Sequence, residues 1–220
     1  MKIGLDLDGT ILDCKPRQTQ LLAVLCRACG FLVDTQWYWS LKRNGCSNRA
    51  ALARMGIGKC QADAVAALWE HAIEDVCWLG FDPLLPGAVE ILHRWRRQGY
   101  SLHLLSARRN HVNARQQLHV LGLDCFASID FVDPFEKHAK EPLITNLRLD
   151  FYIGDTERDA QCADATGVRP ILVSSGLRSE VYLRQSGNWP VVDRLASVQL
   201  PVTRQVIQQN KGKNAVSTYR

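Results

Sequence analysis

Two aspartates follow an apolar segment at the start of the chain, in the sequence LDLDGT of residues 5–10. Side chains two residues apart on an extended strand face the same side, so Asp6 and Asp8 can project together while Leu5 and Leu7 enter a core. Neighbouring carboxylates repel each other unless a cation, a shared proton or a reacting group lies between them. The pattern therefore indicates a catalytic site, with a strand that ends in a hydrated Asp-Gly turn as the simpler alternative.

A second acidic pair, Asp155 and Asp159, lies at the start of a predicted helix over residues 156–166. Four residues apart, the two side chains share one face of that helix. An N-cap role explains Asp155 equally well, but it explains neither Asp159 nor the acidic pair near residue 6. Four carboxylates with few other ligands favour a hard, oxygen-seeking ion, so Mg²⁺ is preferred to zinc.

If the cluster catalyses phosphoryl transfer, it also needs a hydroxyl group and a lysine nearby. A carboxylate that approaches a phosphate dianion is repelled unless positive charge screens both groups. Mg²⁺ and Lys140 can supply that charge, and Ser106 can donate a hydrogen bond to a phosphoryl oxygen. Lys137 is the alternative lysine, and Lys140 is preferred because it opens the helix that precedes the acidic strand.

The hydrophobic pattern predicts how these residues are positioned. Alternating strands and helices indicate an α/β fold with a doubly wound parallel sheet, in which ligands bind beyond the carboxyl ends of the strands. We expect a core of residues 1–15 and 83–200, a helical insertion of residues 16–82 and a basic flexible tail of residues 201–220. The expected strands are 2–7, 101–105, 127–132, 150–153 and 170–173, and the expected helices are 16–29, 47–55, 61–79, 88–98, 112–121, 140–147 and 156–166.

Composition excludes several classes of protein. Hydrophobic residues make up 46% and charged residues 22% of the 220 residues, which is ordinary globular usage without a membrane-spanning run. The eight cysteines are spread singly, unlike a disulfide framework, and the first residues lack the pattern of a secretory signal. These features predict a cytoplasmic protein without a membrane partner.

The net charge of +5 is concentrated at the C-terminus. Residues 201–220 contain four basic residues and no acidic residue, so the remainder of the chain is nearly neutral. This distribution favours a solvated tail over a nucleic-acid-binding arm, and no nucleic-acid partner is expected.

With these candidate catalytic residues, the chain resembles the phosphatase branch of the haloacid dehalogenase superfamily, which has a helical cap, and in particular phosphoglycolate phosphatase-like proteins. The resemblance covers residues 1 to about 175. It rests on four motifs in the family's order and approximate spacing: Asp6-Leu7-Asp8-Gly9-Thr10, Ser106, Lys140, and Gly154-Asp155 with Asp159.

The resemblance implies a role for each of these residues. Asp6 would be the nucleophile that forms an aspartyl-phosphate, and Asp8 the general acid that protonates the leaving group and then activates water. Mg²⁺ would be held by Asp6, the backbone carbonyl of Asp8 and Asp155, with Asp159 nearby. Thr10, Ser106 and Lys140 would bind the phosphate. Residues 16–82 would be the family's mobile cap, which closes over small substrates.

These roles predict a Mg²⁺-dependent phosphomonoester hydrolase that acts on a small phosphorylated metabolite. Dehalogenases of the family lack the equivalent of Asp8, which disfavours halide displacement. A phosphomutase or phosphotransferase and a non-catalytic binding module remain as alternatives. Candidates for recognising the substrate are Arg43, Arg49 and residues 37–39, while Arg108 and Arg109 lie either at the rim of the site or on the surface.

Overall fold

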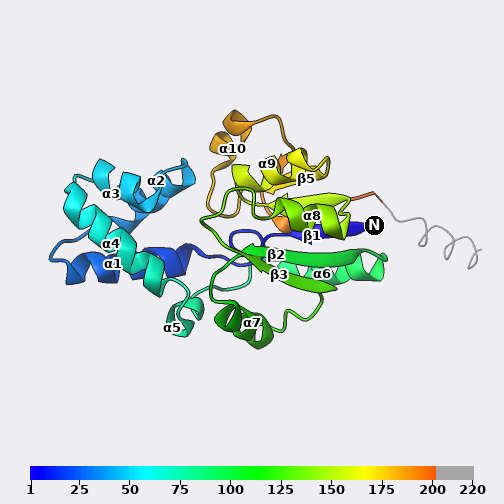
Figure 1. Cartoon of the computed structure of the whole chain (residues 1–220), viewed down its shortest axis with the longest axis horizontal. Coiled ribbons are helices and arrows are strands. Elements are labelled where there is room, and N and C mark those ends of the chain that lie inside the picture. Colours follow the sequence, from blue (N-terminus) through cyan, green and yellow to red (C-terminus); the bar gives the residue numbers. More distant parts are fainter. Residues whose placement is uncertain (202–220) are drawn as a thin grey trace, which may run out of the picture.

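The computed structural model describes residues 1–201, and a parallel sheet of six strands forms its centre (Figure 1). The order of the strands in space is β3-β2-β1-β4-β5-β6, and every adjacent pair is parallel. The expected doubly wound α/β fold is therefore confirmed. The strands are β1 (Lys2–Leu5), β2 (Ser101–Ala107), β3 (Ser128–Val132), β4 (Phe151–Gly154), β5 (Arg169–Val173) and β6 (Val191–Val192).

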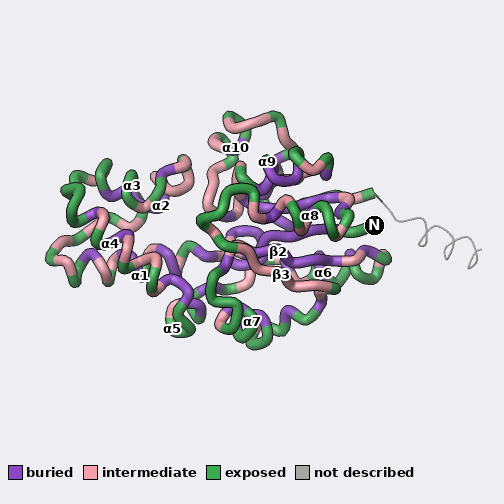
Figure 2. Tube along the Cα trace, viewed as in Figure 1, coloured by how far each residue is buried: buried purple, intermediate pink, exposed green. Residues whose placement is uncertain are grey.

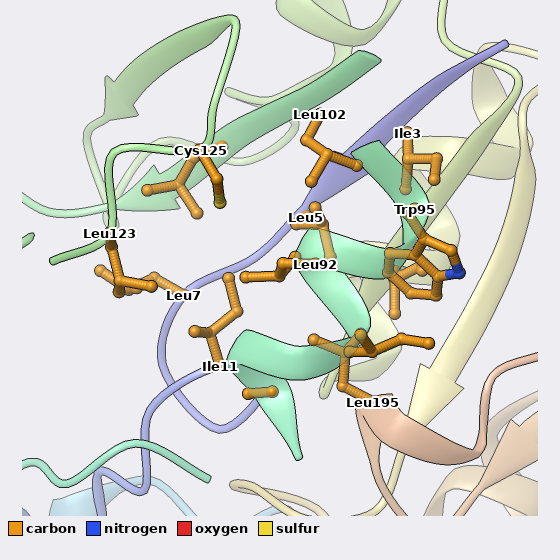
Figure 3. Packing of buried hydrophobic residues seen from close by; sticks show 14 of the residues in the cluster. Ile3, Leu5, Leu7, Ile11, Leu92, Trp95, Leu102, Leu123, Cys125 and Leu195 are labelled. Carbon is orange, nitrogen blue, oxygen red and sulfur yellow. The ribbon is translucent and has the colours of Figure 1, made fainter. Parts of the chain in front are cut away.

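Helices cover both faces of this sheet because each strand alternates its buried side chains between the two faces. On one face, Leu92 and Trp95 of the first core helix pack over Ile3 and Leu5 (Figure 3). On the other face, Ile144 and Ala163 belong to a separate apolar cluster. The core helices are α6 (Ala88–Arg97), α7 (His111–Val120), α8 (Glu141–Leu147), α9 (Glu157–Ala165) and α10 (Glu180–Ser186), followed by a short 3₁₀ turn over Leu195–Ser197.

β1 lies at the middle of the sheet and is packed on both sides. A Cβ atom added at Gly4 would lie 2.4 Å from Leu149 and 2.5 Å from Tyr152, so only glycine allows this face of the strand to be covered so closely. The inner strands are buried in Figure 2, whereas the outer surfaces of the helices are exposed. The first strand is therefore held rigidly beneath the acidic residues that follow it.

The segment between β1 and α6 forms a helical unit that stands apart from the sheet (Figure 1). It has an apolar core of its own, which includes Leu22, Tyr38, Leu52 and Val65. We call residues 15–79 the helical insertion. Its helices are α1 (Lys15–Ala28), α2 (Thr35–Arg43), α3 (Asn48–Arg54), α4 (Lys59–Ala72) and α5 (Val76–Leu79).

The structure differs here from the three helices that the sequence predicts. α2 was not predicted, although Asp34 caps it by accepting hydrogen bonds from the backbone N–H groups of Gln36 and Trp37. The predicted helix over 61–79 is also wrong, because it divides into α4 and α5. At the break, the carboxylate of Glu74 accepts hydrogen bonds from the backbone N–H groups of Arg109 and Asn110, a long-range contact that the local sequence does not reveal.

Two further elements, β6 and α10, were not predicted either.

None of the helices within residues 1–201 is long and apolar enough to cross a membrane. Residues 202–220, which make up nearly all of the predicted basic tail, lie outside the described residues.

Candidate active site

Three carboxylates converge at the carboxyl ends of β1 and β4. Asp6 directly follows β1, Asp155 directly follows β4, and Asp159 lies in the first turn of α9. One carboxylate oxygen from each of the three lies within 4.8 Å of the others, and all three residues are buried. Burial and the neighbouring acids together outweigh the nearby lysine and raise the pKa of Asp6 to about 7. Burial and the charges of Asp6 and Asp159 also raise the pKa of Asp155.

Lys140 partly compensates for this negative charge. Its Nζ lies 2.6 Å from Asp6 Oδ1 and 2.7 Å from Asp159 Oδ1, and the residue is buried at the N-cap of α8. Burial would lower the pKa of Lys140, but the two carboxylates raise it well above its usual value, so the ammonium group stays charged. Lys137 is exposed, and Lys140 is therefore the lysine that the fold brings to the cluster.

Asp159 is already held by hydrogen bonds. Besides the ammonium group of Lys140, its carboxylate accepts bonds from the backbone N–H and the hydroxyl of Thr156, at 3.1 and 2.6 Å. Burial would raise the pKa of Asp159, but Lys140 and these bonds lower it. Asp159 therefore combines a helix-capping role with the orientation of Lys140.

Two glycines allow the backbone to approach Asp155. A Cβ atom at Gly9, where φ is +76°, would lie 2.1 Å from Asp155 Oδ2, and one at Gly176 would lie 2.0 Å from it. The same oxygen accepts a hydrogen bond of 2.6 Å from the backbone N–H of Leu177. The loops after β1 and β5 thus form a tight cradle around Asp155, in which a side chain on either glycine would disturb the carboxylate.

The donor set of this cluster fits a small, hard cation. Carboxylate oxygens from Asp6, Asp155 and Asp159 are the ligands that Mg²⁺ prefers. Asp6 accepts a hydrogen bond from Lys140 and Asp155 one from Leu177, whereas Asp159 accepts bonds from Lys140 and from both the backbone and the hydroxyl of Thr156. Asp6 and Asp155 are therefore the residues best suited to hold the ion directly.

Thr10 and Ser106, the two predicted phosphate-binding hydroxyl residues, are both buried near the ends of their strands. Thr10 follows β1 and Ser106 is the penultimate residue of β2. The Oγ1 atom of Thr10 has no hydrogen-bond partner among the described residues. A buried hydroxyl without a hydrogen-bond partner lowers the stability of the fold, and a polar ligand bound at the site would remove this cost.

Asp8 points to a different set of partners. Arg108 binds both of its carboxylate oxygens, with Nε at 2.6 Å and Nη2 at 2.7 Å, and Arg17 Nη2 lies 2.5 Å from Oδ1. Burial alone would raise the pKa of Asp8, but the two guanidinium groups lower it to about 2. In this conformation Asp8 is an anion. Arg108, for which the sequence allows a place at the rim of the site or on the surface, is buried beside Asp8.

The same network reaches the two ends of the helical insertion. Arg17 lies in α1, and its Nε donates a hydrogen bond of 3.0 Å to Asp82, just beyond α5. Gln117 of α7 donates a bond of 3.1 Å to the other oxygen of Asp82. Sequence reasoning missed Arg17 and Asp82. A signal was present, because the two ends of an insertion must meet where the chain leaves and rejoins the core.

We expect Arg108→Met to lower the free energy of unfolding by about 3 kcal/mol at pH 7, because Asp8 would lose its bidentate partner at a partly buried position. The folded pKa of Asp8, about 2, lies below its ordinary value of 3.8, so this stabilisation is present above pH 4 and is lost as the pH falls toward 2. Urea unfolding at pH 7, 5 and 3 tests this, and the difference from wild type should shrink as the pH falls. Arg49→Gln, which removes half-exposed pairs with Asp63 and Glu70, is the control and should cost no more than about 1 kcal/mol. Equal losses in the two variants would contradict the assignment.

The residues proposed for substrate recognition lie in different environments. Arg43 Nη2 donates to the backbone carbonyls of Ser174 and Arg178, at 2.7 and 3.2 Å, and thereby ties the helical insertion to the loop after β5. Arg49 is half-exposed and forms ion pairs with Asp63 and Glu70 of the same insertion. Of the aromatic residues at 37–39, Trp37 is exposed, whereas Tyr38 and Trp39 are buried, Tyr38 in the apolar core of the insertion. Arg109 contacts the backbone of Glu70.

Lys42 is a further polar residue that sequence reasoning missed. Its Nζ lies 2.8 Å from Asn48 Oδ1 and 6.0 Å from the centre of the Trp69 ring, and among residues 1–201 no carboxylate lies within ion-pair distance of it. Its backbone carbonyl accepts a hydrogen bond of 3.2 Å from Arg178, next to the Leu177 amide that binds Asp155. Burial and the charge of Arg178 lower the pKa of Lys42 to about 8. A cation therefore lies without an anionic partner beside the loop that forms the site.

Comparison with known proteins agrees with this arrangement. A family model described as haloacid dehalogenase-like hydrolase matches residues 3–173, a range that contains every carboxylate and the lysine of the cluster. No curated protein sequence matches the chain significantly.

Several solved structures share the fold over nearly the whole chain. A haloacid dehalogenase-like family hydrolase from Streptococcus pneumoniae is 16% identical, with a TM-score of 0.71, and the match covers 95% of this chain and 97% of that one. A predicted phosphatase from Clostridium acetobutylicum is 19% identical, with a TM-score of 0.65 and coverages of 96% and 98%. A predicted phosphoglycolate phosphatase from Haemophilus somnus is 16% identical, with a TM-score of 0.65 and coverages of 94% and 96%. At these identities the likeness shows the fold.

Proposed function

Because this chain belongs to the haloacid dehalogenase-like hydrolase family, we propose that it is a Mg²⁺-dependent phosphomonoester hydrolase that acts on a small phosphorylated metabolite. The observation that supports this most strongly is the position of Lys140 Nζ, within 2.7 Å of both Asp6 and Asp159, beside a third carboxylate at ligand distance. Such an arrangement offers a nucleophile, a cation site and a fixed positive charge at one point, which is what phosphoryl transfer requires.

In the proposed reaction, an Asp6 carboxylate oxygen attacks the phosphorus atom and the bond between phosphorus and the ester oxygen breaks. The leaving alcohol takes a proton, and an aspartyl-phosphate remains on Asp6. Water then attacks that phosphorus and loses a proton, which releases inorganic phosphate and restores Asp6. Lys140 holds Asp6 in place and neutralises charge on the phosphoryl group, while Thr10 and Ser106 donate hydrogen bonds to its oxygens. Asp6, Asp155 and the backbone carbonyl of Asp8 would hold Mg²⁺, which would supply further positive charge beside the phosphoryl group.

Asp8 is proposed as the group that exchanges these protons. As a carboxylate it can accept the proton of the attacking water, and its bonds to Arg108 and Arg17 favour that charged form. Donation of a proton to the leaving group requires these bonds to loosen. Since Arg17 belongs to the helical insertion, movement of the insertion is a means of changing them.

We propose that the helical insertion is a cap over the site and that Lys42 recognises a second anionic group on the substrate. A charged amine that is partly buried and lacks a carboxylate partner is stabilised by binding an anion. The substrate class that fits is therefore a small phosphate ester with a carboxylate or a second phosphate.

Lys42→Met should lower kcat/KM for a phosphate ester that carries a carboxylate by about 10- to 100-fold, the range expected for one lost hydrogen bond to a charged group. An aryl phosphate without a second anion should be hydrolysed at an unchanged rate. Lys59→Met, at an exposed position of the same insertion, is the matched control. Equal losses on both esters would remove Lys42 from substrate recognition and leave the hydrolase proposal intact.

A phosphotransferase is the second candidate, and one observation favours it. The arginine contacts of Asp8 oppose its movement toward a water molecule, and slow hydrolysis would leave the aspartyl-phosphate available to an acceptor alcohol. Free phosphate and phosphorylated acceptor can be measured in the same reaction to distinguish the two.

The proposed function is tested with a panel of small phosphate esters, assayed with and without Mg²⁺. Phosphate release that requires Mg²⁺ and is absent from the Asp6→Asn protein is expected. Transferred or isomerised phosphate in place of free phosphate would establish the second candidate. Turnover of 2-chloro acids to release chloride, with no phosphate released from any ester, would overturn both.

A further inference from the structure

Three side chains with different metal-binding atoms meet outside the carboxylate cluster. His138, Glu141 and Cys162 each place one ligand atom, a ring nitrogen, a carboxylate oxygen and a sulfur, within 4.8 Å of the others. They come from separate parts of the chain: the loop after β3, the start of α8, and α9. Nothing in the proposed hydrolase mechanism uses them.

The environment of these side chains suits an ion that enters from solvent. Cys162 is buried at the base, the Glu141 side chain is 27% exposed and the His138 side chain is 63% exposed. His138 Nδ1 and Glu141 Oε1 lie 2.5 Å apart. The backbone of His138 adopts a φ of +64°, a left-handed conformation that non-glycine residues rarely adopt.

We propose that His138, Glu141 and Cys162 form a site for a borderline-soft divalent ion of the Zn²⁺ class, separate from the Mg²⁺ site. Nitrogen, sulfur and one carboxylate are the ligand types that Zn²⁺ selects, and a water molecule completes a tetrahedron. Metal–ligand bonds of about 2.0–2.3 Å place tetrahedral ligands about 3.3–3.6 Å apart. Binding therefore requires His138 and Glu141 to separate by about 1 Å, which the exposed imidazole can accommodate. The Cys162 thiol gives its proton to solvent as the sulfur binds.

Such an ion would connect the two segments that carry catalytic side chains. Glu141 follows Lys140, and Cys162 lies one helical turn after Asp159. An ion bound to the three residues would hold the loop of residues 133–140 against α9, and its stabilisation of the folded protein would rise with the logarithm of its free concentration above the dissociation constant.

The test is a titration of the untagged, reduced, full-length protein with Co²⁺ in the presence of excess Mg²⁺. A thiolate ligand gives a sulfur-to-cobalt charge-transfer band in the near ultraviolet, which carboxylate ligands alone cannot give. One equivalent of Co²⁺ should saturate this band, and Zn²⁺ should displace the Co²⁺ and remove the band. Zn²⁺ should also raise the melting temperature in the same buffer.

Cys162→Ala should abolish the band, and His138→Ala should weaken Co²⁺ binding by at least tenfold. His138 is largely exposed, so its replacement keeps the test valid if the cysteine variant does not fold. The variant in which the exposed Cys60 and Cys77 are both serine should retain the band. Loss of the band in that control would show that Co²⁺ binds at surface thiols only. Full affinity in His138→Ala would show that His138 is not a ligand. Either result would overturn the proposal. Neither result would affect the hydrolase proposal, because the carboxylate cluster is unchanged in all of these proteins.

Discussion

Asp6→Asn is expected to reduce phosphate release by at least about 10³-fold, while the protein remains folded. The amide cannot form an acyl-phosphate, and no other carboxylate in the cluster can replace Asp6, because Asp155 is confined between Gly9 and Gly176 and Asp159 is bound by Lys140 and Thr156. The measurement is kcat on the best ester of the panel. Asp124→Asn, at an exposed position away from the strand ends, should retain wild-type activity. Residual turnover of more than a few per cent in pure Asp6→Asn protein would exclude Asp6 as the nucleophile.

The same variant has an expected signature in stability. The folded pKa of Asp6, about 7, lies above its ordinary value of 3.8, so ionisation of this group destabilises the wild-type fold progressively between about pH 4 and pH 7. Asparagine has no such ionisation. Without divalent ions, Asp6→Asn should therefore gain more stability relative to wild type at pH 8 than at pH 5. A constant difference across this range would contradict the raised pKa.

Removal of Mg²⁺ is expected to have the second-largest effect. Activity should disappear with a chelator, return with Mg²⁺ and be inhibited by Ca²⁺, whose larger and looser coordination shell misplaces the attacking carboxylate. Asp155→Asn should raise the Mg²⁺ concentration needed for half-maximal activity by at least tenfold, because Asp155 is a proposed ligand and the cation that lowers its pKa, Arg178, is paired with Glu157. Mg²⁺ should raise the melting temperature of the wild type by relieving the repulsion between Asp6 and Asp155, and this rise should be absent from Asp155→Asn.

Asp124→Asn is also the control for Asp155→Asn, because Asp124 is exposed and lies in the segment between α7 and β3. Its Mg²⁺ requirement should be unchanged. Full activity of the wild type in chelator would contradict a metal-assisted reaction.

The sequence was sufficient to predict the fold class and the convergence of Asp6, Asp155, Asp159 and Lys140. This succeeded because parallel strands end at one edge of a sheet, so residues that follow different strands meet there. The roles of these residues remain predictions. The partners of Asp8 were not predictable from local pattern, since Arg108 follows β2 and Arg17 lies in the helical insertion.

Shorter elements were missed for a related reason. β6 has two residues and exists through its pairing with β5, and the break between α4 and α5 depends on the contact of Glu74 with the start of α7. Both depend on residues distant in sequence. Lys42 was missed because its lack of a carboxylate partner depends on the folded structure and not on the local sequence.

The central position of β1 also bears on how the chain folds during its synthesis. Lys2 pairs with Ser101 in β2, and Ile3 pairs with Phe151 in β4, so β1 is synthesised about 100 residues before one neighbour and about 150 residues before the other. At about 5–20 residues per second, this delay amounts to roughly 5–30 seconds on the ribosome. During that time the helical insertion can fold around its own apolar core, whereas the apolar β1 strand remains unpaired. The strand that precedes the proposed nucleophile therefore needs protection from aggregation until β2 and β4 have been made.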